Sequence, residues 1–250
     1  MPEIDSHNIS DAWSAAVGLA RNTPGHEAFN LNVSVTGLER GGPDENADMR
    51  SLLDEMLSAA EMASVETVAN TIFPESLWNP RRPKEDLFAR YMKAFPKIRR
   101  YPPNRRGTYF ERMIDYPAEN GQKFNQLSQV IETYLGGNHR RSALQVSVIV
   151  PWKDLNDARQ QGFPCMQQVA LIPRAAAGTL RVVGFYPHQY LFERAYGNYL
   201  GLIRLGRFVA HEMHLTLSAM TCVATIAHLD VPVRTIAPVL ELAQAVLEEA

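Results

Sequence analysis

The fold of this chain is decided by ALQVSVIVPWKDLNDARQQGFPCMQQVALIPRAAAGTLRVVGFYPHQ, residues 143–189. Three runs within it, 143–150, 165–174 and 178–189, are rich in β-branched and aromatic residues, which is typical of strands. The second and third runs are joined by a short Arg/Ala/Gly turn and predict a β-hairpin. The stretch therefore predicts a sheet built from the second half of the chain.

Helices and two further strands flank this region. Residues 30–37 and 221–231 are expected to form the strands, and 79–107, with many basic residues and five prolines, is interpreted as an irregular surface excursion. Because strands and helices do not alternate strictly, the sequence predicts an α+β fold in one domain over residues 1–250. Helices are predicted where apolar residues recur at three- and four-residue spacing, over 10–21, 49–72, 123–135, 198–217 and 238–250.

Composition places the chain among ordinary globular proteins. In 250 residues, 25 Lys and Arg stand against 27 Asp and Glu, a formal charge of −2, which argues against a generally basic nucleic-acid binder. The apolar region 200–229 is interrupted by charged residues, so no stretch predicts a membrane span. The chain has two cysteines and begins without the pattern of a secretory signal. We expect a cytoplasmic protein with reduced thiols that binds neither nucleic acid nor membrane.

Cys165 is the residue best placed for chemistry. It stands in GFPCMQQ, after a Gly/Pro break and at the start of a predicted strand, where a thiol stays reachable. The alternative is a buried cysteine that acts as a small apolar side chain. A nucleophilic thiolate needs positive charge nearby, and Arg140 and Arg141 are candidates for that charge, for phosphate ligands, or for a solvated surface pair. His211 and His214 have no third ligand nearby, so no metal site is predicted.

Five segments form one collinear set of motifs: RGTYFERM (106–113), NQLSQVIETYLGGNHRRSALQVSVIVPWKDL (125–155), FPCMQQVAL (163–171), TLRVVGFYPHQYLFERAYGN (179–198) and AHLD (227–230). In this order they resemble the thymidylate synthase family, with its G-x-Y-G segment, D-Q helix, S-R-R pair, P-C-H nucleophile, Q-R-S-x-D strand, P-F-N helix start and H-x-Y strand. The resemblance covers roughly residues 105–230. It implies a thymidylate synthase-like fold, a mixed sheet packed with helices, whose sheet mediates a homodimer.

The resemblance implies roles for the residues that match its motifs. Cys165 would be the thiolate that adds to C6 of a pyrimidine and turns C5 into a carbon nucleophile. Arg140 and Arg141 would reach across a dimer interface to the phosphate of the partner's nucleotide. Asn198 would read the polar edge of the base, because an amide both donates and accepts hydrogen bonds.

Four further positions complete the implied site. Tyr109 matches a tyrosine that helps to remove the proton from C5, and His228 matches the histidine that contacts the sugar. Glu66, in VETVANTIF, is matched with the glutamate that organises water around the base. His188 lies close to the position of a family arginine, where it could supply a proton or a phosphate contact or be an ordinary core or surface histidine.

The chain departs from the family pattern in the parts that handle phosphate, sugar and folate. Met166 replaces the histidine after the nucleophile, and YPHQY at 186–190 replaces Q-R-S-x-D, so the arginine beside the catalytic sulfur is missing. Asp230 replaces the tyrosine of H-x-Y. The sequence ends about 20 residues after His228, whereas the family continues with a segment that closes over the folate.

Three hypotheses for function follow. The first is a homodimeric transferase that methylates or hydroxymethylates C5 of a pyrimidine nucleotide through Cys165, with 5,10-methylenetetrahydrofolate as donor and no metal. The second keeps Cys165 and the nucleotide pocket but uses no folate, for example to exchange the C5 hydrogen. The third is a non-catalytic nucleotide-binding relative. The motifs leave open whether the nucleotide is uridine or cytidine, ribo or deoxyribo.

Overall fold

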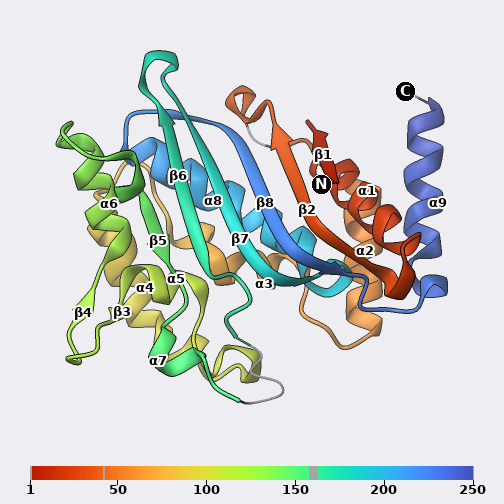
Figure 1. Cartoon of the computed structure of the whole chain (residues 1–250), viewed down its shortest axis with the longest axis horizontal. Coiled ribbons are helices and arrows are strands. Elements are labelled where there is room, and N and C mark those ends of the chain that lie inside the picture. The colour runs from red at the N-terminus through yellow and green to blue at the C-terminus, as the bar shows by residue number, and fades with distance from the viewer. Residues whose placement is uncertain (1, 42, 158–162, 250) are drawn as a thin grey trace.

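A mixed six-stranded sheet forms the centre of the protein. The computed structural model describes residues 2–41, 43–157 and 163–249. The strands of the sheet are β1 (Glu3–Ser6), β2 (Glu27–Thr36), β5 (Gln145–Ser147), β6 (Gln168–Arg174), β7 (Thr179–Tyr190) and β8 (Thr216–His228). In the order β1-β2-β8-β7-β6-β5, the pairs β1–β2 and β7–β8 are parallel and the other pairs antiparallel (Figure 1). A separate ribbon pairs β3 (Tyr116–Pro117) with β4 (Lys123–Phe124).

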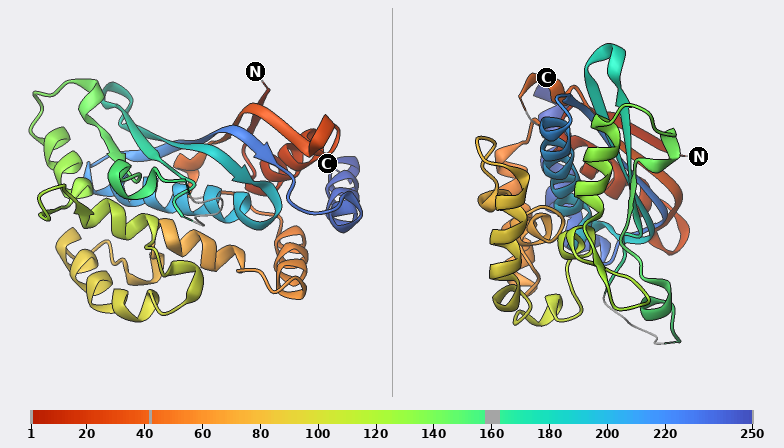
Figure 2. Two further views of the ribbon diagram at one scale, coloured as in Figure 1. Left: turned by 60° about the horizontal axis from the view of Figure 1, so that its bottom comes forward. Right: turned by 90° about the vertical axis from the view of Figure 1, so that its left-hand side faces the viewer.

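Helices gather on one side of the sheet, as Figure 2 shows. They are α1 (Ile9–Arg21), α2 (Ala47–Ala59), α3 (Val65–Ile72), α4 (Lys84–Ile98), α5 (Tyr109–Ile114), α6 (Gln126–Leu135), α7 (Pro151–Asp154), α8 (Tyr196–Glu212) and α9 (Val233–Glu249). α8 packs on β7 and β8, α1 packs on β2, and α3 packs against α8. A mixed sheet with helices around it agrees with the predicted α+β class. None of the helices in the described ranges is both long and apolar enough to cross a bilayer.

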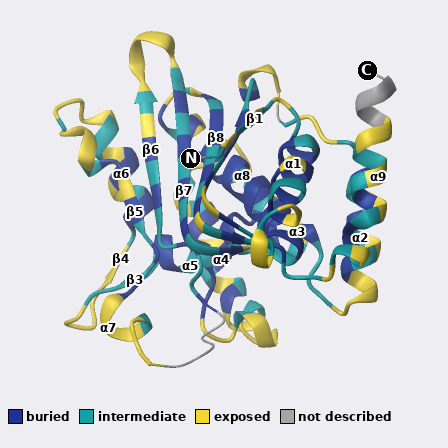
Figure 3. Ribbon diagram, turned by 45° about the vertical axis from the view of Figure 1, so that its right-hand side comes forward, coloured by how far each residue is buried: buried dark blue, intermediate teal, exposed yellow. Residues whose placement is uncertain are grey.

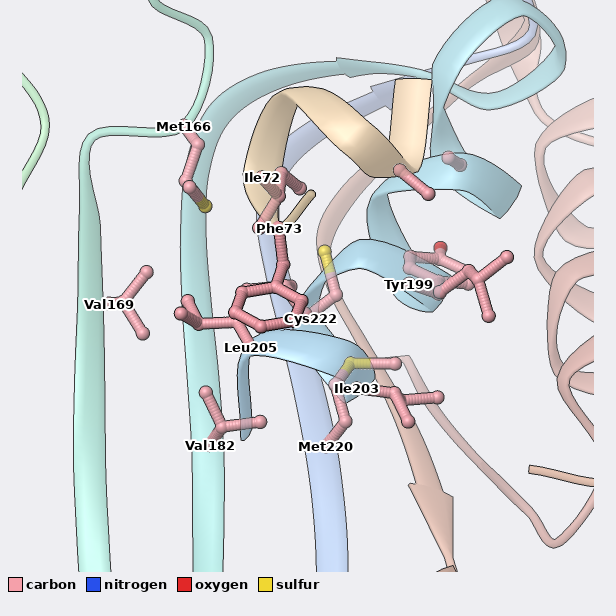
Figure 4. Packing of buried hydrophobic residues seen from close by; sticks show 14 of the residues in the cluster. Ile72, Phe73, Met166, Val169, Val182, Tyr199, Ile203, Leu205, Met220 and Cys222 are labelled. Carbon is pink, nitrogen blue, oxygen red and sulfur yellow. The ribbon is translucent and has the colours of Figure 1, made fainter. Parts of the chain in front are cut away.

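The two faces of the sheet differ because successive strand residues point to opposite sides. Val182, Met220 and Cys222 face the helices and are almost completely buried, among the side chains of Figure 4. On the opposite face, Ile172 is 46% exposed. Figure 3 shows buried residues concentrated in α8 and in the strands beside it. The hydrophobic core therefore lies between one face of the sheet and the helices.

Helix α8 lies close to α3 because it carries glycine at the points of contact. A Cβ on Gly197 would come within 2.6 Å of the Val68 Cβ, and a Cβ on Gly201 would come within 2.8 Å of the Ala69 carbonyl oxygen. Both distances are shorter than any ordinary van der Waals contact. A larger side chain at either position would push the two helices apart.

The predicted single helix over 49–72 is wrong in its middle. The chain forms two helices there, α2 and α3, separated by residues 60–64, where Glu61 has a φ of 55°. Ser64 begins α3 by accepting a hydrogen bond from the Thr67 N–H at 3.2 Å. The apolar spacing continues across the break, so it indicated the buried face correctly but not the turn.

The interpretation of 79–107 as an irregular excursion is also wrong. Residues 84–98 form α4, and Pro83 stands immediately before its first residue, where a proline is tolerated because the first helical N–H groups need no partner within the helix. The many prolines and basic residues of 79–107 made the apolar three- and four-residue spacing of this helix difficult to recognise in the sequence. Its buried residues are Leu87, Phe88, Tyr91 and Phe95.

Element ends in the last third of the chain also differ from the prediction. The hairpin of β6 and β7 is confirmed. The helix predicted to run to residue 217 ends at Glu212, and β8 begins at Thr216 instead of 221, after a turn in which His214 has a φ of 56°. The apolar and small residues after this turn suit either structure, so sequence spacing did not locate the boundary. α9 begins at Val233, with Pro238 inside it.

Replacing Gly201 by alanine tests the close approach of α8 and α3. The new methyl group would lie 2.8 Å from backbone, so we expect Gly201→Ala to lower the free energy of unfolding by about 1–3 kcal/mol. The control is Gly18→Ala in α1, where nothing lies within 4 Å of the new Cβ; it should be neutral or stabilise by up to about 1 kcal/mol. Urea denaturation measures both, and equal effects would contradict the packing argument.

Candidate active site

A cavity of about 490 Å³ lies where β7 ends and α8 begins. Four residues that the sequence predicted for the site line it, namely Cys165, Tyr109, Asn198 and His188. They come from the segment before β6, the start of α5, helix α8 and the end of β7. The volume falls within the roughly 300–1,000 Å³ of ligand pockets. The fold thus brings four distant parts of the sequence to one pocket of ligand size.

Cys165 is half-buried in the wall of this cavity. Burial raises the pKa of its thiol above the ordinary value of 9.0, the Arg194 guanidinium opposes that rise, and the Glu193 carboxylate adds to it. The thiol is therefore protonated at neutral pH in the free protein. Cys222 lies in the core, where burial raises its pKa to about 12 and the Gln189 amide lies 3.4 Å from its sulfur. Of the two thiols, only Cys165 faces the cavity.

Arg194 supplies positive charge at the site, where the motif comparison found an arginine missing. It belongs to the π-helical segment Leu191–Ala195, directly before α8, and lines the cavity. Its guanidinium pairs with the Glu193 carboxylate at 2.6 Å. Sequence reasoning missed Arg194 because it does not occupy the aligned position. The signal that could have found it is its spacing, about one helical turn before Asn198.

Asp230 holds this segment in place. Its carboxylate accepts hydrogen bonds from the N–H groups of Phe192 at 2.8 Å and Glu193 at 3.2 Å. Burial raises the pKa of Asp230, although these backbone hydrogen bonds oppose the rise. Asp230 thus fixes the backbone at the start of α8, and with it the position of Arg194.

Two residues of the pocket lining carry polar groups without a hydrogen-bond partner among the described residues. Asn198 is only 3% exposed, and its side chain makes no hydrogen bond within the described part of the chain. The buried hydroxyl of Tyr186 also lacks a partner among the described residues. Burial raises the pKa of both Tyr109 and Tyr186, so their hydroxyls stay protonated at neutral pH. Because an unpaired buried polar group is costly, this wall suits a polar ligand.

A buried ion pair holds the opposite part of the wall. Arg112 of α5 and Asp154 are joined at 2.9 and 3.1 Å, and their side chains are 2% and 4% exposed. The Arg112 guanidinium also lies 5.3 Å from the centre of the Phe163 ring, which is itself 5.1 Å from the Tyr109 ring. The pair therefore fixes Tyr109 relative to the segment that leads to Cys165.

Glu66 is not brought to this cavity. Its carboxylate accepts hydrogen bonds from Arg204 at 2.8 and 2.9 Å, and these bonds lower its pKa. Its side chain is half exposed, on the outer side of α3. In this structure Glu66 belongs to a surface ion-pair cluster and is absent from the residues that line the pocket.

Arg140, Arg141 and His228 also lie outside the cavity lining. The two arginines are exposed immediately before β5. His228, at the end of β8, is a neighbour of His188, with 5.8 Å between their ring centres. The monomer thus assembles the thiol, hydroxyl and amide of the predicted site but not its arginine pair.

The chain matches no protein-family model, and no curated protein matches it significantly. The case for a function therefore rests on the chemistry of the residues that line this cavity.

Alkylation by iodoacetamide tests the electrostatics around Cys165. We expect Cys165 to react before Cys222, at a rate that rises with pH through 9 because its thiol is protonated below its raised pKa. Arg194→Gln removes a charge that favours the thiolate, so the rate at pH 8 should fall about three- to tenfold. The control is Arg207→Gln, an exposed arginine on α8. Equal rates in both variants would show that Arg194 does not act on the thiol.

Proposed function

We propose that the protein is a thymidylate synthase-like transferase that acts at C5 of a pyrimidine nucleotide through addition of Cys165 to C6. The observation that carries the proposal is the meeting of Cys165, Tyr109 and Asn198 in one cavity, with Arg194 near the thiol. These are a nucleophile, a hydroxyl, an amide and a positive charge. The thymidylate synthase resemblance implies that the nucleophile, the hydroxyl and the amide lie in one site. Arg194 supplies a positive charge in place of the arginine that the aligned motif lacks.

The chemistry begins when the Cys165 thiol gives its proton to water and its sulfur attacks C6. The new C–S bond displaces the C5–C6 electron pair toward C5 and the exocyclic group at C4, which makes C5 nucleophilic. The Asn198 amide can donate to or accept from the polar edge of the base. A bound folate would supply the one-carbon unit that C5 attacks and, for methylation, the hydride, while its own nitrogen would be the leaving group. Loss of the C5 proton to water and return of the C5–C6 double bond would then release the Cys165 sulfur. The positive charge of Arg194 favours the Cys165 thiolate both when it attacks C6 and when it leaves at the end of the reaction.

Tyr109 is suited to the proton at C5. Because its hydroxyl is protonated at neutral pH, it can hold a water molecule that accepts this proton, instead of taking the proton itself. Its ring is held by Phe163, so the hydroxyl keeps its position during the reaction.

An exposed aromatic ring at the rim of the cavity could bind the expected donor, 5,10-methylenetetrahydrofolate. Tyr190 lines the cavity and is 38% exposed, so its ring offers a flat aromatic face for a pteridine. When bound, the folate supplies the one-carbon unit. The residues described above act on the nucleotide and its protons.

The open face of the sheet supports a homodimer. Ile172 is exposed there, and Val183 and Phe185 are only half-buried. An apolar sheet face of this kind is usually covered by another layer. A second copy in an isologous contact would cover it. Arg140 and Arg141, which are exposed next to β5, would then be available to the partner's nucleotide.

Sedimentation velocity tests the dimer. We expect the wild-type protein to sediment as a dimer and Val183→Arg to sediment as a monomer, because the substitution buries an unpaired charge in the contact. The control is Lys93→Glu on α4, on the helical side of the sheet, which should remain dimeric. A wild-type monomer, or a dimeric Val183→Arg with native circular dichroism, would rule out this interface.

Covalent capture tests the reaction. Fluorine at C5 cannot leave as a cation. In the presence of methylenetetrahydrofolate, a 5-fluoropyrimidine nucleotide should therefore stop the reaction after Cys165 has bonded to C6 and C5 has taken the one-carbon unit. Intact-protein mass spectrometry with 5-fluoro derivatives of UMP, dUMP, CMP and dCMP should show one adduct. The adduct should disappear in Cys165→Ser and persist in Cys222→Ser.

Parallel reactions separate the three hypotheses. Turnover of the unfluorinated nucleotide only with methylenetetrahydrofolate would support the transferase. Loss of C5 deuterium without folate would favour the folate-independent chemistry. Nucleotide binding without an adduct would favour a non-catalytic relative, and the absence of both binding and adduct with all four nucleotides would overturn the proposal.

A further inference from the structure

Two imidazoles and a carboxylate converge at one end of the sheet. Glu27 of β2, His228 of β8 and His188 of β7 come from three strands that lie side by side (Figure 1). Glu27 pairs in register with His228, which pairs with Tyr190, two residues beyond His188. One ligand atom from each of the three side chains lies within 4.8 Å of those of the other two. The juxtaposition depends on strand pairing, because the residues are far apart in the sequence.

The Tyr190 ring lies 4.9 Å from the His188 ring and 5.9 Å from the His228 ring, but the donor atoms of the three side chains have no hydrogen-bond partner among the described residues. Within the described ranges, the Glu27 carboxylate forms no ion pair, and neither imidazole makes a hydrogen bond. All three are only partly exposed. Unengaged donor atoms that face one another at the end of a rigid sheet are the arrangement that a metal ion requires.

The donor set and its spacing suit a divalent transition metal. Two histidines and one carboxylate leave coordination positions open, as in catalytic zinc sites and in the facial triad of non-haem iron. With metal–ligand bonds of about 2.1 Å, tetrahedral ligands stand roughly 3.4 Å apart. The three donors, which lie within 4.8 Å of one another, therefore need to approach by at most about 1.4 Å, which rotation of half-exposed side chains permits.

We propose that Glu27, His188 and His228 bind a divalent transition-metal ion of the zinc class. From the sequence, only His211 and His214 are considered as metal ligands, and no metal site is predicted. The ion would lie at the edge of the cavity, because His188 and Tyr190 both line it. Its open positions would take an oxyanion, such as a phosphate of the pocket's ligand. This inference goes beyond the proposed function and does not depend on it, because the site binds metal without a nucleotide.

Metal titration of the untagged, full-length protein tests the proposal. After treatment with a chelator and its removal, isothermal titration with ZnCl₂ should show one site per chain. CoCl₂ should produce visible d–d bands without the near-ultraviolet sulfur-to-cobalt band that a thiolate ligand gives. Binding to the folded state should also raise the melting temperature.

Single substitutions assign the ligands. Glu27→Gln, His188→Gln and His228→Gln should each weaken zinc binding more than about 100-fold, above the loss expected for an outer-shell partner. His211→Gln and Cys165→Ser are matched controls that should bind zinc as the wild type does. Circular dichroism and metal-free melting establish that each variant is folded.

Two results would overturn the metal site. One is the absence of zinc binding to the wild-type protein. The other is binding that persists in folded variants of all three ligands, or that is lost in Cys165→Ser. No nucleotide enters these measurements, so failure of the metal site and failure of the C5 chemistry are observed separately.

Discussion

The position of α8 is the constraint on which the rest of the structure depends. The helix lies between the sheet and α3, and glycine permits the close contact on both sides. On the sheet side, a Cβ on Gly206 would meet Leu217 at 2.8 Å, and a Cβ on Gly184 of β7 would meet Leu202 at 2.6 Å. Because close-packed interiors do not adapt to extra atoms without strain, this packing sets the height of α8 above the sheet. Because Asn198 lies in the first turn of α8, the same packing fixes the position of the polar wall of the cavity.

A second constraint holds the other wall. The Arg112–Asp154 pair is almost inaccessible to water, and removing one partner of such a pair leaves a buried charge uncompensated. Its guanidinium also packs against Phe163, near Cys165 in the chain. The segment that carries the Cys165 thiol is therefore held by its contact with the buried Arg112 guanidinium. The thiol faces α8, whose position is fixed by packing. Two independent elements of the core define the distance across the pocket.

Charge at the pocket is arranged differently from the pattern that the motifs suggested. Arg194 brings positive charge to Cys165 from the start of α8, and Asp230 orders the backbone that carries it. Burial has the largest effect on the pKa of the Cys165 thiol and raises it, so the thiol stays protonated in the free protein. A phosphate-bearing ligand would meet Arg194 within the cavity and, in the proposed assembly, Arg140 and Arg141 of a second copy.

The sequence by itself determined strands β2, β5, β6, β7 and β8, most of the helices, the β6–β7 hairpin and the candidates Cys165, Tyr109, Asn198 and His188. These follow from local periodicity and from motifs in chain order, whereas the short strands β1, β3 and β4 were missed. Only the tertiary structure decided what lies beside them. Strand alternation shows which residues share a face but not which strands become neighbours, so Glu27, His188 and His228 could not be brought together from sequence. The same holds for Glu66, whose carboxylate is bound by Arg204, 138 positions away. Contacts between distant segments depend on how the helices and strands pack, and no local pattern records that.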